Sequence, residues 1–199
     1  MAFPLDGIRR SVAAQVPLTD EEFNRFASLL EYRQLERKQP LLNVGESCWF
    51  EGFVVSGCLR IYHTDSDGWE FVLDFASENQ WIADIGSFAA QSPSQFAIDT
   101  LEPTELLLLK KSDKERLYQD VPKCERLFRA LTQRAVMALQ LRLISTLHQN
   151  AERRYEDFKR RFPGLEGRIA QHQIAAYLGI SPEFLSRIRH RQSGVELVR

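Results

Sequence analysis

Hydrophobic and polar positions change their spacing along the chain, and each change predicts a different kind of structure. Over Leu18–Glu31 the apolar residues Phe23, Phe26 and Leu30 recur at helical spacing. The stretch TDEE at the start of this segment has a threonine three residues before a glutamate, which is the pattern of a capping box. The segment is therefore predicted to be an amphipathic helix.

From about Tyr32 the pattern becomes a series of short apolar or alternating runs separated by turn residues. Short strands at intervals of about 8–12 residues predict an antiparallel barrel or sandwich. The clearest hairpin is TDSDGWE, where Asp67-Gly68 is expected to supply the positive φ angles of a tight turn. The predicted turns are Asn43–Ser47, Ser56-Gly57, Asp65–Gly68 and Glu102-Pro103.

After Ser112 the helical period returns and continues to about Gln149, with two apolar stripes. One stripe consists of Leu127, Leu131, Ala135, Ala138 and Leu141, and the other of Phe128, Val136, Leu139, Leu143 and Leu147. Because a helix with one stripe packs on one neighbour, two stripes predict burial on two sides. The second neighbour is either another copy of this chain or the rest of a single core. A further amphipathic helix follows, with Tyr155, Phe158 and Phe162 in register and Pro163-Gly164 at its end.

The stretch IAAYLGISPEFLSRIR predicts two short helices joined by a tight turn. The first helix covers Gln171–Leu178, and Gly179 follows it where a left-handed residue ends a helix. Ile180 fills the angle between the helices, Ser181 is a favourable N-cap, and Pro182 occupies the first helical position. This combination is typical of a helix-turn-helix.

The second of these helices is predicted to read DNA. It is expected to bury Phe184, Leu185 and Ile188, and to leave Glu183, Ser186, Arg187, His190 and Arg191 toward solvent. Arg187 can pair bidentately with guanine and Glu183 can accept from cytosine, while Ser181 and the helix start suit phosphate. The alternative interpretation is a helical hairpin whose surface happens to be polar.

Composition and charge are consistent with a cytoplasmic, nucleic-acid-binding protein. The chain has 199 residues, of which 44% are hydrophobic and 27% charged, and no apolar run is long enough to cross a bilayer. Its start, MAFPLDGIRR, does not have the pattern of a secretory signal. The net charge of −1 is uneven: residues 150–199 hold 10 Lys and Arg against 6 Asp and Glu, whereas residues 1–149 hold 16 against 21. A basic C-terminal segment favours a polyanionic partner.

No catalytic or metal site is expected. Cys48, Cys58 and Cys124 lack the spacing of metal or iron–sulfur ligands and are interpreted as buried or incidental thiols. The histidines are scattered, at His63, His148, His172 and His190. His63 is the histidine of the predicted barrel, and it is interpreted as a surface residue rather than a haem ligand. We therefore predict no enzyme activity, no metal and no cofactor.

Nearly the whole chain resembles the cyclic-AMP receptor protein and fumarate–nitrate regulator (Crp/Fnr) family of bacterial transcription regulators. VVSGCLRIYHTDSDGWEFVLDF is similar to the central β-roll strands of that family, and IAQHQIAAYLGISPEFLSRIR is similar to its terminal motif. The resemblance implies an α+β fold with an N-terminal antiparallel β-roll (a cyclic-nucleotide-binding-like jelly roll) and flanking helices at 1–120. A long dimerisation helix and hinge would follow at 121–149, with the hinge near Gln149-Asn150. A helix-turn-helix domain would occupy 150–199, and because little chain (RQSGVELVR) remains, its wing is expected to be short or absent.

The resemblance also implies residue roles. Ser181 and Gln171 would contact phosphate, and the recognition helix keeps Glu183 and Arg187 of an Arg-Glu-x-x-x-Arg pattern but has Pro182 at its first position. The target sequence is therefore expected to differ from that of relatives. The predicted DNA-binding set is Gln171, His172, Ser181, Pro182, Glu183, Ser186, Arg187, His190 and Arg191.

The phosphate-binding cassette of the family corresponds to WIADIGSFAAQSPSQFAIDT, and this segment departs from the pattern. Ala83-Asp84-Ile85 replaces Gly-Glu-Leu, and Ser94-Gln95 replaces the Arg-Ser pair that holds the phosphate. Because a buried phosphate would lose its guanidinium partner, we expect no tight binding of cyclic AMP. These five residues either line an altered effector pocket or leave an empty one.

The predicted function is that of a homodimeric transcription regulator that binds a partly palindromic site in double-stranded DNA. Its half-sites would lie about 10–10.5 base pairs apart, and the resemblance implies RNA polymerase as a further partner. Its small-molecule effector is not predicted. The alternative function is a small-ligand sensor or protein-interaction module with a vestigial helix-turn-helix.

Overall fold

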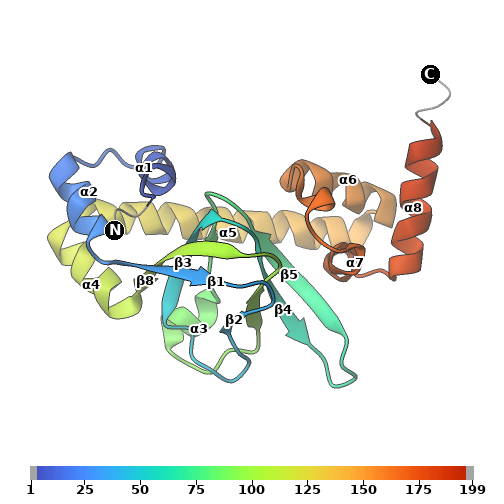
Figure 1. Ribbon diagram of the computed structural model, residues 1–199, viewed down its shortest axis with the longest axis horizontal. Helices are drawn as coiled ribbons and strands as arrows, with labels where there is room; N and C mark the ends of the chain where they lie inside the picture. Colours follow the sequence, from blue (N-terminus) through green and yellow to red (C-terminus); the bar gives the residue numbers. More distant parts are fainter. Residues whose placement is uncertain (1–3, 196–199) are drawn as a thin grey trace. The chain divides into compact units, whose positions relative to one another are not determined.

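The computed structural model describes residues 4–195, which divide into two compact units (Figure 1). The first unit consists of residues up to 63 together with 73–135, and the second of residues 64–72 together with the chain from 136. The elements, in chain order, are α1 (Asp6–Ala13), α2 (Asp20–Ala27), β1 (Leu30–Leu35), β2 (Pro40–Leu42), β3 (Phe50–Ser56), β4 (Leu59–Thr64), β5 (Glu70–Ala76), β6 (Trp81–Ile82), α3 (Ile85–Ala90), β7 (Ala97–Thr100), β8 (Thr104–Lys110), α4 (Lys111–Asp120), α5 (Lys123–His148), α6 (Ala151–Arg161), a 3₁₀ turn η1 (Leu165–Gly167), α7 (Gln171–Leu178) and α8 (Pro182–Val195).

The first unit is built on two four-stranded sheets, with the strand orders β1-β8-β3-β6 and β2-β7-β4-β5. Neighbouring strands pair antiparallel; for example, Leu30 of β1 is opposite Leu109 of β8. Side chains from both sheets meet in one apolar cluster, in which Phe50 and Leu106 from the first sheet join Ile98 from the second. The predicted β-roll is confirmed.

Strand β8 is buried on both faces because helices cover the side that points away from the other sheet. Leu106 and Leu108 join the cluster between the sheets, whereas Leu107 and Leu109 pack with residues of α1, α2, α4 and α5. Alternate side chains of a strand point to opposite faces, so a run of four leucines is what two-sided burial requires. Figure 1 shows α2 and α4 side by side, and Arg25 of α2 pairs with Asp120 at the end of α4.

The N-terminal helical region differs from the prediction in its extent. The capping box is present, with Thr19 Oγ1 accepting from the Glu22 N–H at 3.2 Å and the Glu22 carboxylate accepting from the Thr19 N–H at 2.8 Å. However, the helix ends at Ala27, and Leu30 belongs to β1, where it pairs with Leu109. Ladder pairing with a distant strand overrides the local spacing at this position. Helix α1 was not predicted from the sequence.

The predicted hairpin between β4 and β5 is confirmed, but its turn uses one positive φ angle rather than two. Gly68 has a φ of 84°, whereas Asp67 is not among the described residues with positive φ. The Gly68 N–H donates to the Asp65 carbonyl at 3.1 Å, and the Asp65 N–H donates to the Trp69 carbonyl at 3.0 Å. The Asp65 carboxylate also accepts from the backbone N–H groups of Asp67 and Trp69, which stabilises the turn.

The helical segment after Ser112 is divided into α4 and α5 at Val121-Pro122. Proline lacks an N–H and disfavours helical backbone in the preceding residue, which explains the break. The apolar side chains of the two α5 stripes are buried near its N-terminal end and exposed toward its C-terminal end. Leu127 and Phe128 are buried in the first unit, whereas the side chains of Val136, Met137, Leu139, Leu141, Leu143, Ile144 and Leu147 are exposed.

Helices α6, α7 and α8 form the core of the second unit. Tyr155, Phe158 and Phe162 are buried, as predicted, and the rings of Phe158 and Phe162 contact Tyr177 of α7 at centroid distances of 5.6 and 5.7 Å. No helix among residues 4–195 is long and apolar enough to cross a membrane. The wing was predicted to be short or absent from residues 191–199; residues 191–195 are helical and belong to α8, and residues 196–199 lie outside the described residues.

Candidate nucleic-acid interface and effector cassette

The turn between α7 and α8 has the geometry that the sequence predicts. Gly179 ends α7 with a φ of 65°, and the next N–H, from Ile180, donates to the Ala175 carbonyl at 3.1 Å. Ser181 Oγ accepts from the Phe184 N–H at 3.2 Å, which caps the start of α8. Pro182 is the first residue of α8, where a missing N–H costs no intrahelical bond. The helix-turn-helix is therefore formed by local backbone chemistry.

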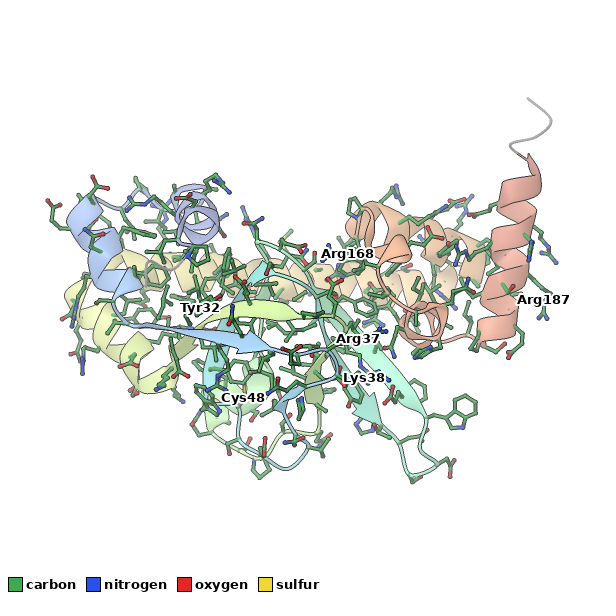
Figure 2. The ribbon with its side chains drawn as sticks, in the orientation of Figure 1. Tyr32, Arg37, Lys38, Cys48, Arg168 and Arg187 are labelled. Carbon is green, nitrogen blue, oxygen red and sulfur yellow. The ribbon has the colours of Figure 1, made fainter. Side chains whose placement is uncertain are left out.

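Helix α8 buries one face and exposes another. Leu185 and Ile188 are fully buried, but Phe184 is only half-buried, which corrects the prediction that it belongs to the core. The guanidinium carbon of Arg187 lies 5.3 Å from the centre of the Phe184 ring. Figure 2 shows Arg187 on the outer side of α8, away from the other helices of its unit. The half-buried ring thus supports the aliphatic part of an exposed arginine.

Glu183 and Arg187 are both exposed and lie one helical turn apart. Hydrogen bonds from the backbone N–H of Glu183 and from the Ser181 hydroxyl, followed by the charge of Arg187, hold the pKa of the Glu183 carboxyl below its usual value. The carboxylate is therefore ionised at neutral pH and acts only as an acceptor. An acceptor and a guanidinium on one exposed turn are a suitable pair for reading base edges.

The other residues of the predicted DNA-binding set lie in the same unit but differ in their exposure. Gln171 and His172 at the start of α7, and His190 and Arg191 on α8, are exposed, while Ser186 is half-buried. Arg191 is partly engaged, because it pairs with Glu152 of α6 at 3.1 Å. Arg189, two residues earlier on α8, is half-buried and pairs with Glu166 at 3.2 Å.

Arg168 is a candidate contact that the sequence interpretation missed. It is exposed just before α7 and, like Arg187, belongs to the second unit; both residues are labelled in Figure 2. It follows η1 and lies outside the α-helices, so the helical spacing of apolar residues in the sequence did not indicate it. The signal that could have found it is its position three residues before Gln171, itself predicted to contact phosphate.

The cassette residues Asp84 and Ser94 come together, ten positions apart in sequence. The Ser94 hydroxyl donates to Asp84 Oδ2 at 2.6 Å, and the Ser87 N–H donates to Asp84 Oδ1 at 3.1 Å. Asp84 is thereby the N-cap of α3, and both residues are buried. The Ser87 hydroxyl donates to the Ser92 carbonyl at 2.5 Å and accepts from the Cys48 N–H at 2.8 Å. Each carboxylate oxygen of Asp84 therefore has a partner within the chain.

Among the predicted cassette residues, Ser94 hydrogen-bonds to the Asp84 carboxylate, and the other three differ from this buried pair in their exposure. The side chains of Ile85 and Gln95 are exposed, and Ala83 is half-buried. The carbonyl of Gln95 contacts His63 Nδ1 at 3.0 Å, and His63 is exposed, as predicted.

The thiol interpretation is also confirmed. Cys48, Cys58 and Cys124 are free and buried. Burial raises the pKa of the Cys124 thiol to about 11, so the thiolate needed for metal binding is disfavoured. Among residues 4–195 no three His, Cys, Asp or Glu side chains are grouped so that they could hold a metal ion.

Comparison with known proteins supports the β-roll assignment. Residues 32–121 match the family described as the cyclic nucleotide-binding domain. No curated protein sequence matches the chain significantly.

The solved structures to which the chain is similar include those of three bacterial proteins. The c-di-GMP-responsive global regulator CLP of Xanthomonas campestris is 15% identical, with a TM-score of 0.71 over 91% of this chain and 95% of CLP. FixK2 of Bradyrhizobium japonicum is 18% identical, with a TM-score of 0.74 over 84% and 86%. The catabolite activator protein of Thermus thermophilus is 24% identical, with a TM-score of 0.56 over 95% and 89%. Residues 32–121 are thus similar to the cyclic nucleotide-binding domain family, and the chain has the same fold as these three solved structures.

Proposed function

We propose that the protein is a homodimeric, sequence-specific DNA-binding regulator of transcription that works without cyclic AMP. The observation that carries the proposal is the capped helix-turn-helix with Glu183 and Arg187 on the exposed first turns of α8. The N-terminal part of such a helix enters the major groove, where Arg187 pairs with guanine and Glu183 accepts from cytosine. Ser181, Gln171 and Arg168 lie at or before helix starts, where contacts to phosphate position the protein.

Dimerisation through α5 follows from its uncovered apolar residues. Val136, Leu139 and Leu143 are spaced by three and four residues, which is the seam of a coiled coil. Their exposed fractions are 47%, 41% and 58%. Pairing two copies along this seam buries these side chains and presents two recognition helices to a site with two-fold symmetry. RNA polymerase remains a partner implied by the family resemblance.

The independence from cyclic AMP rests on the Asp84–Ser94 hydrogen bond. A nucleotide phosphate placed against Ser94 would meet a buried hydroxyl already bonded to a carboxylate, in place of a guanidinium. Desolvating the phosphate without a charged partner is unfavourable, and the neighbouring carboxylate adds repulsion.

The experiment that tests DNA binding is selection from random duplex DNA by the purified full-length protein, without ligand, at two salt concentrations. A two-fold motif whose affinity falls with salt is the expected result, because neutralised phosphates release counterions. No enrichment at either salt concentration would favour the alternative, a ligand sensor with a vestigial helix-turn-helix.

Replacing Arg187 with alanine is expected to weaken binding to the selected motif and to relax one base position. The loss of one bidentate pair costs about 1–3 kcal/mol, or roughly 5- to 150-fold in affinity. Fluorescence anisotropy with the motif and with each single-base variant measures both effects. Arg10→Ala is the matched control, because it removes an exposed arginine from α1 in the other unit. Equal affinities of the wild type and Arg187→Ala would remove Arg187 from the recognition surface.

Cyclic AMP is expected to leave the thermal stability of the protein unchanged. A nucleotide present at about 100 times its Kd would raise the free energy of unfolding by about 2.7 kcal/mol, which a melting curve detects easily. Differential scanning fluorimetry with about 1 mM nucleotide therefore detects binding with a dissociation constant of roughly 10 µM or less. A cyclic-nucleotide-binding protein serves as the positive control, and a concentration-dependent rise in melting temperature would contradict the prediction.

A further inference from the structure

A cavity of about 670 Å³ lies within the second unit, between the C-terminal half of α5, helix α6 and the end of α7. All of its lining residues belong to that unit, and it is separate from the cassette at Asp84 and Ser94. Its volume is in the range of sites for small organic molecules, which is about 300–1,000 Å³. The cavity is therefore large enough for a ligand rather than only for water.

The lining carries an excess of positive charge. Four arginines and one aspartate line it, which is a balance of +3; these residues are Arg142, Arg154, Arg160, Arg161 and Asp157. Asp157 forms an ion pair with Arg160. The acidic residue of the cavity is thus already paired, and the excess favours an anion.

The guanidinium of Arg154, one of the lining arginines, is bound by backbone carbonyls and, among the described residues, not by a carboxylate. Its terminal nitrogens donate to backbone carbonyls, of Gln149 at 3.2 Å and of Leu178 at 3.1 Å. Its Nε is buried and makes no hydrogen bond within the described chain. These carbonyls lie just after α5 and at the end of α7, so the guanidinium joins the two helix ends. A bound anion would supply the charge partner that the carbonyls do not.

The cavity also has apolar walls. Leu141 and Ile144 of α5, Phe158 of α6 and Tyr177 of α7 all contribute to its lining. The guanidinium of Arg142 lies over the Tyr177 ring, 4.0 Å from its centre, and donates to the Tyr177 carbonyl at 2.8 Å. A ligand with a flat apolar body can therefore pack against the walls while its charged group faces the arginines.

We propose that this cavity is a binding site for a small organic anion, with a carboxylate or phosphate group attached to an apolar, preferably aromatic, body. The anionic group interacts with the arginines, and the body contacts the apolar walls formed by α5, α6 and α7. The site lies outside the β-roll that carries the cyclic nucleotide-binding domain. Binding is measured without DNA, so the proposal stands or falls independently of the proposed function.

The test is calorimetric titration of the full-length protein with matched probes at pH 7. The probes are 2-naphthoate and 2-naphthyl phosphate, which are anionic, 2-naphthol, which is neutral and of the same shape, and inorganic phosphate, which lacks the apolar body. One naphthoate or naphthyl phosphate per chain is expected to bind at least about tenfold more tightly than naphthol or inorganic phosphate, because charge-assisted and apolar contacts are both required. The tighter of the two anionic probes identifies the preferred charged group.

Two variants and their controls locate the site. Ala138→Phe fills the cavity and is expected to abolish binding, whereas Met137→Phe adds the same ring at an exposed position that does not line it. Arg160→Gln removes an exposed lining charge and is expected to weaken binding several-fold, while Arg153→Gln changes an exposed arginine of the same helix outside the lining. Equal binding of naphthoate and naphthol, or binding that persists in Ala138→Phe at wild-type strength, would overturn the proposal. Absence of binding by both anionic probes to a folded protein would also overturn it.

Discussion

The double replacement of Leu139 and Leu143 by glutamate is expected to convert the proposed dimer to a monomer. Fully burying one leucine contributes about 1.5–3 kcal/mol, and pairing buries about half of that surface because Leu139 and Leu143 are 41% and 58% exposed in the single chain. Replacing the four leucines that meet in the pair of helices by like charges therefore removes roughly 3–6 kcal/mol of association free energy. Both positions are exposed in the single chain, so folding of the chain itself is not expected to change.

Sedimentation equilibrium measures this outcome as the mass of one chain instead of two. A monomer also loses the effective concentration that links two half-sites, so affinity for the selected DNA motif should fall by about 100-fold or more. Val44→Glu is the control, because Val44 is 58% exposed on a loop of the first unit. If the double variant sediments as a dimer, the seam at Val136, Leu139 and Leu143 is not the dimer interface.

The second large effect is expected from Lys114→Met, which should destabilise the first unit by about 3–5 kcal/mol. Lys114 Nζ of α4 lies 2.6 Å from Glu51 Oε2 of β3, and the two side chains are only 12% and 14% exposed. The ammonium group also lies 4.2 Å from the centre of the Phe128 ring. Removing the lysine leaves a carboxylate buried among apolar groups without its counter-charge.

The pH dependence of this loss has a definite sign. Burial raises the pKa of the Glu51 carboxyl, and the charge of Lys114 opposes that shift. A raised pKa in the folded state means that the folded chain prefers the protonated acid. Without Lys114, stability should therefore be greatest below the unfolded pKa of about 4.3, and should fall as pH rises through the folded pKa. The cost of Lys114→Met is accordingly largest at neutral pH and smaller in acid.

Urea unfolding at pH 7 and near pH 4 measures both the loss of stability caused by Lys114→Met and its dependence on pH. Lys110→Met is the matched control, since Lys110 pairs with Glu31 at 3.0 Å with side chains 48% and 37% exposed. Such a surface pair contributes no more than about 1 kcal/mol. The double variant Glu51→Leu/Lys114→Met should recover most of the loss, because no buried charge remains. Equal costs for Lys114→Met and Lys110→Met would show that the buried pair is no more important than a surface one.

The candidate sites differ in how far the sequence predicted them. The turn between α7 and α8 was predicted in detail because its chemistry is local: Gly179, Ser181 and Pro182 act on backbone within a few residues. The exposure of Glu183 and Arg187 followed from helical period alone. In contrast, the sequence interpretation left open whether Asp84 and Ser94 line a ligand pocket, and only the structure shows that they bond to each other.

Burial on α5 and α8 was also decided by tertiary packing. The two stripes of α5 are each continuous in the sequence, yet their N-terminal residues are buried on the first unit and their C-terminal residues are not. Phe184 has the period of a core residue, but it lies at the margin of the second unit and supports Arg187 instead. The Glu51–Lys114 pair joins residues 63 positions apart and has no local signature.

What the sequence by itself determined is the order and type of most elements, the capping of α2 and α8, and the turn of the helix-turn-helix. These features depend on hydrogen bonds and backbone angles within a few residues, so short patterns specify them. What only the tertiary structure decided is which side chains meet across the fold. Leu30 pairs with Leu109 in a ladder, Ser94 donates to the Asp84 carboxylate, and one arginine of α5 lines a cavity with three arginines of α6. Such contacts depend on packing between segments that are distant in sequence, so the local spacing of hydrophobic residues does not predict them.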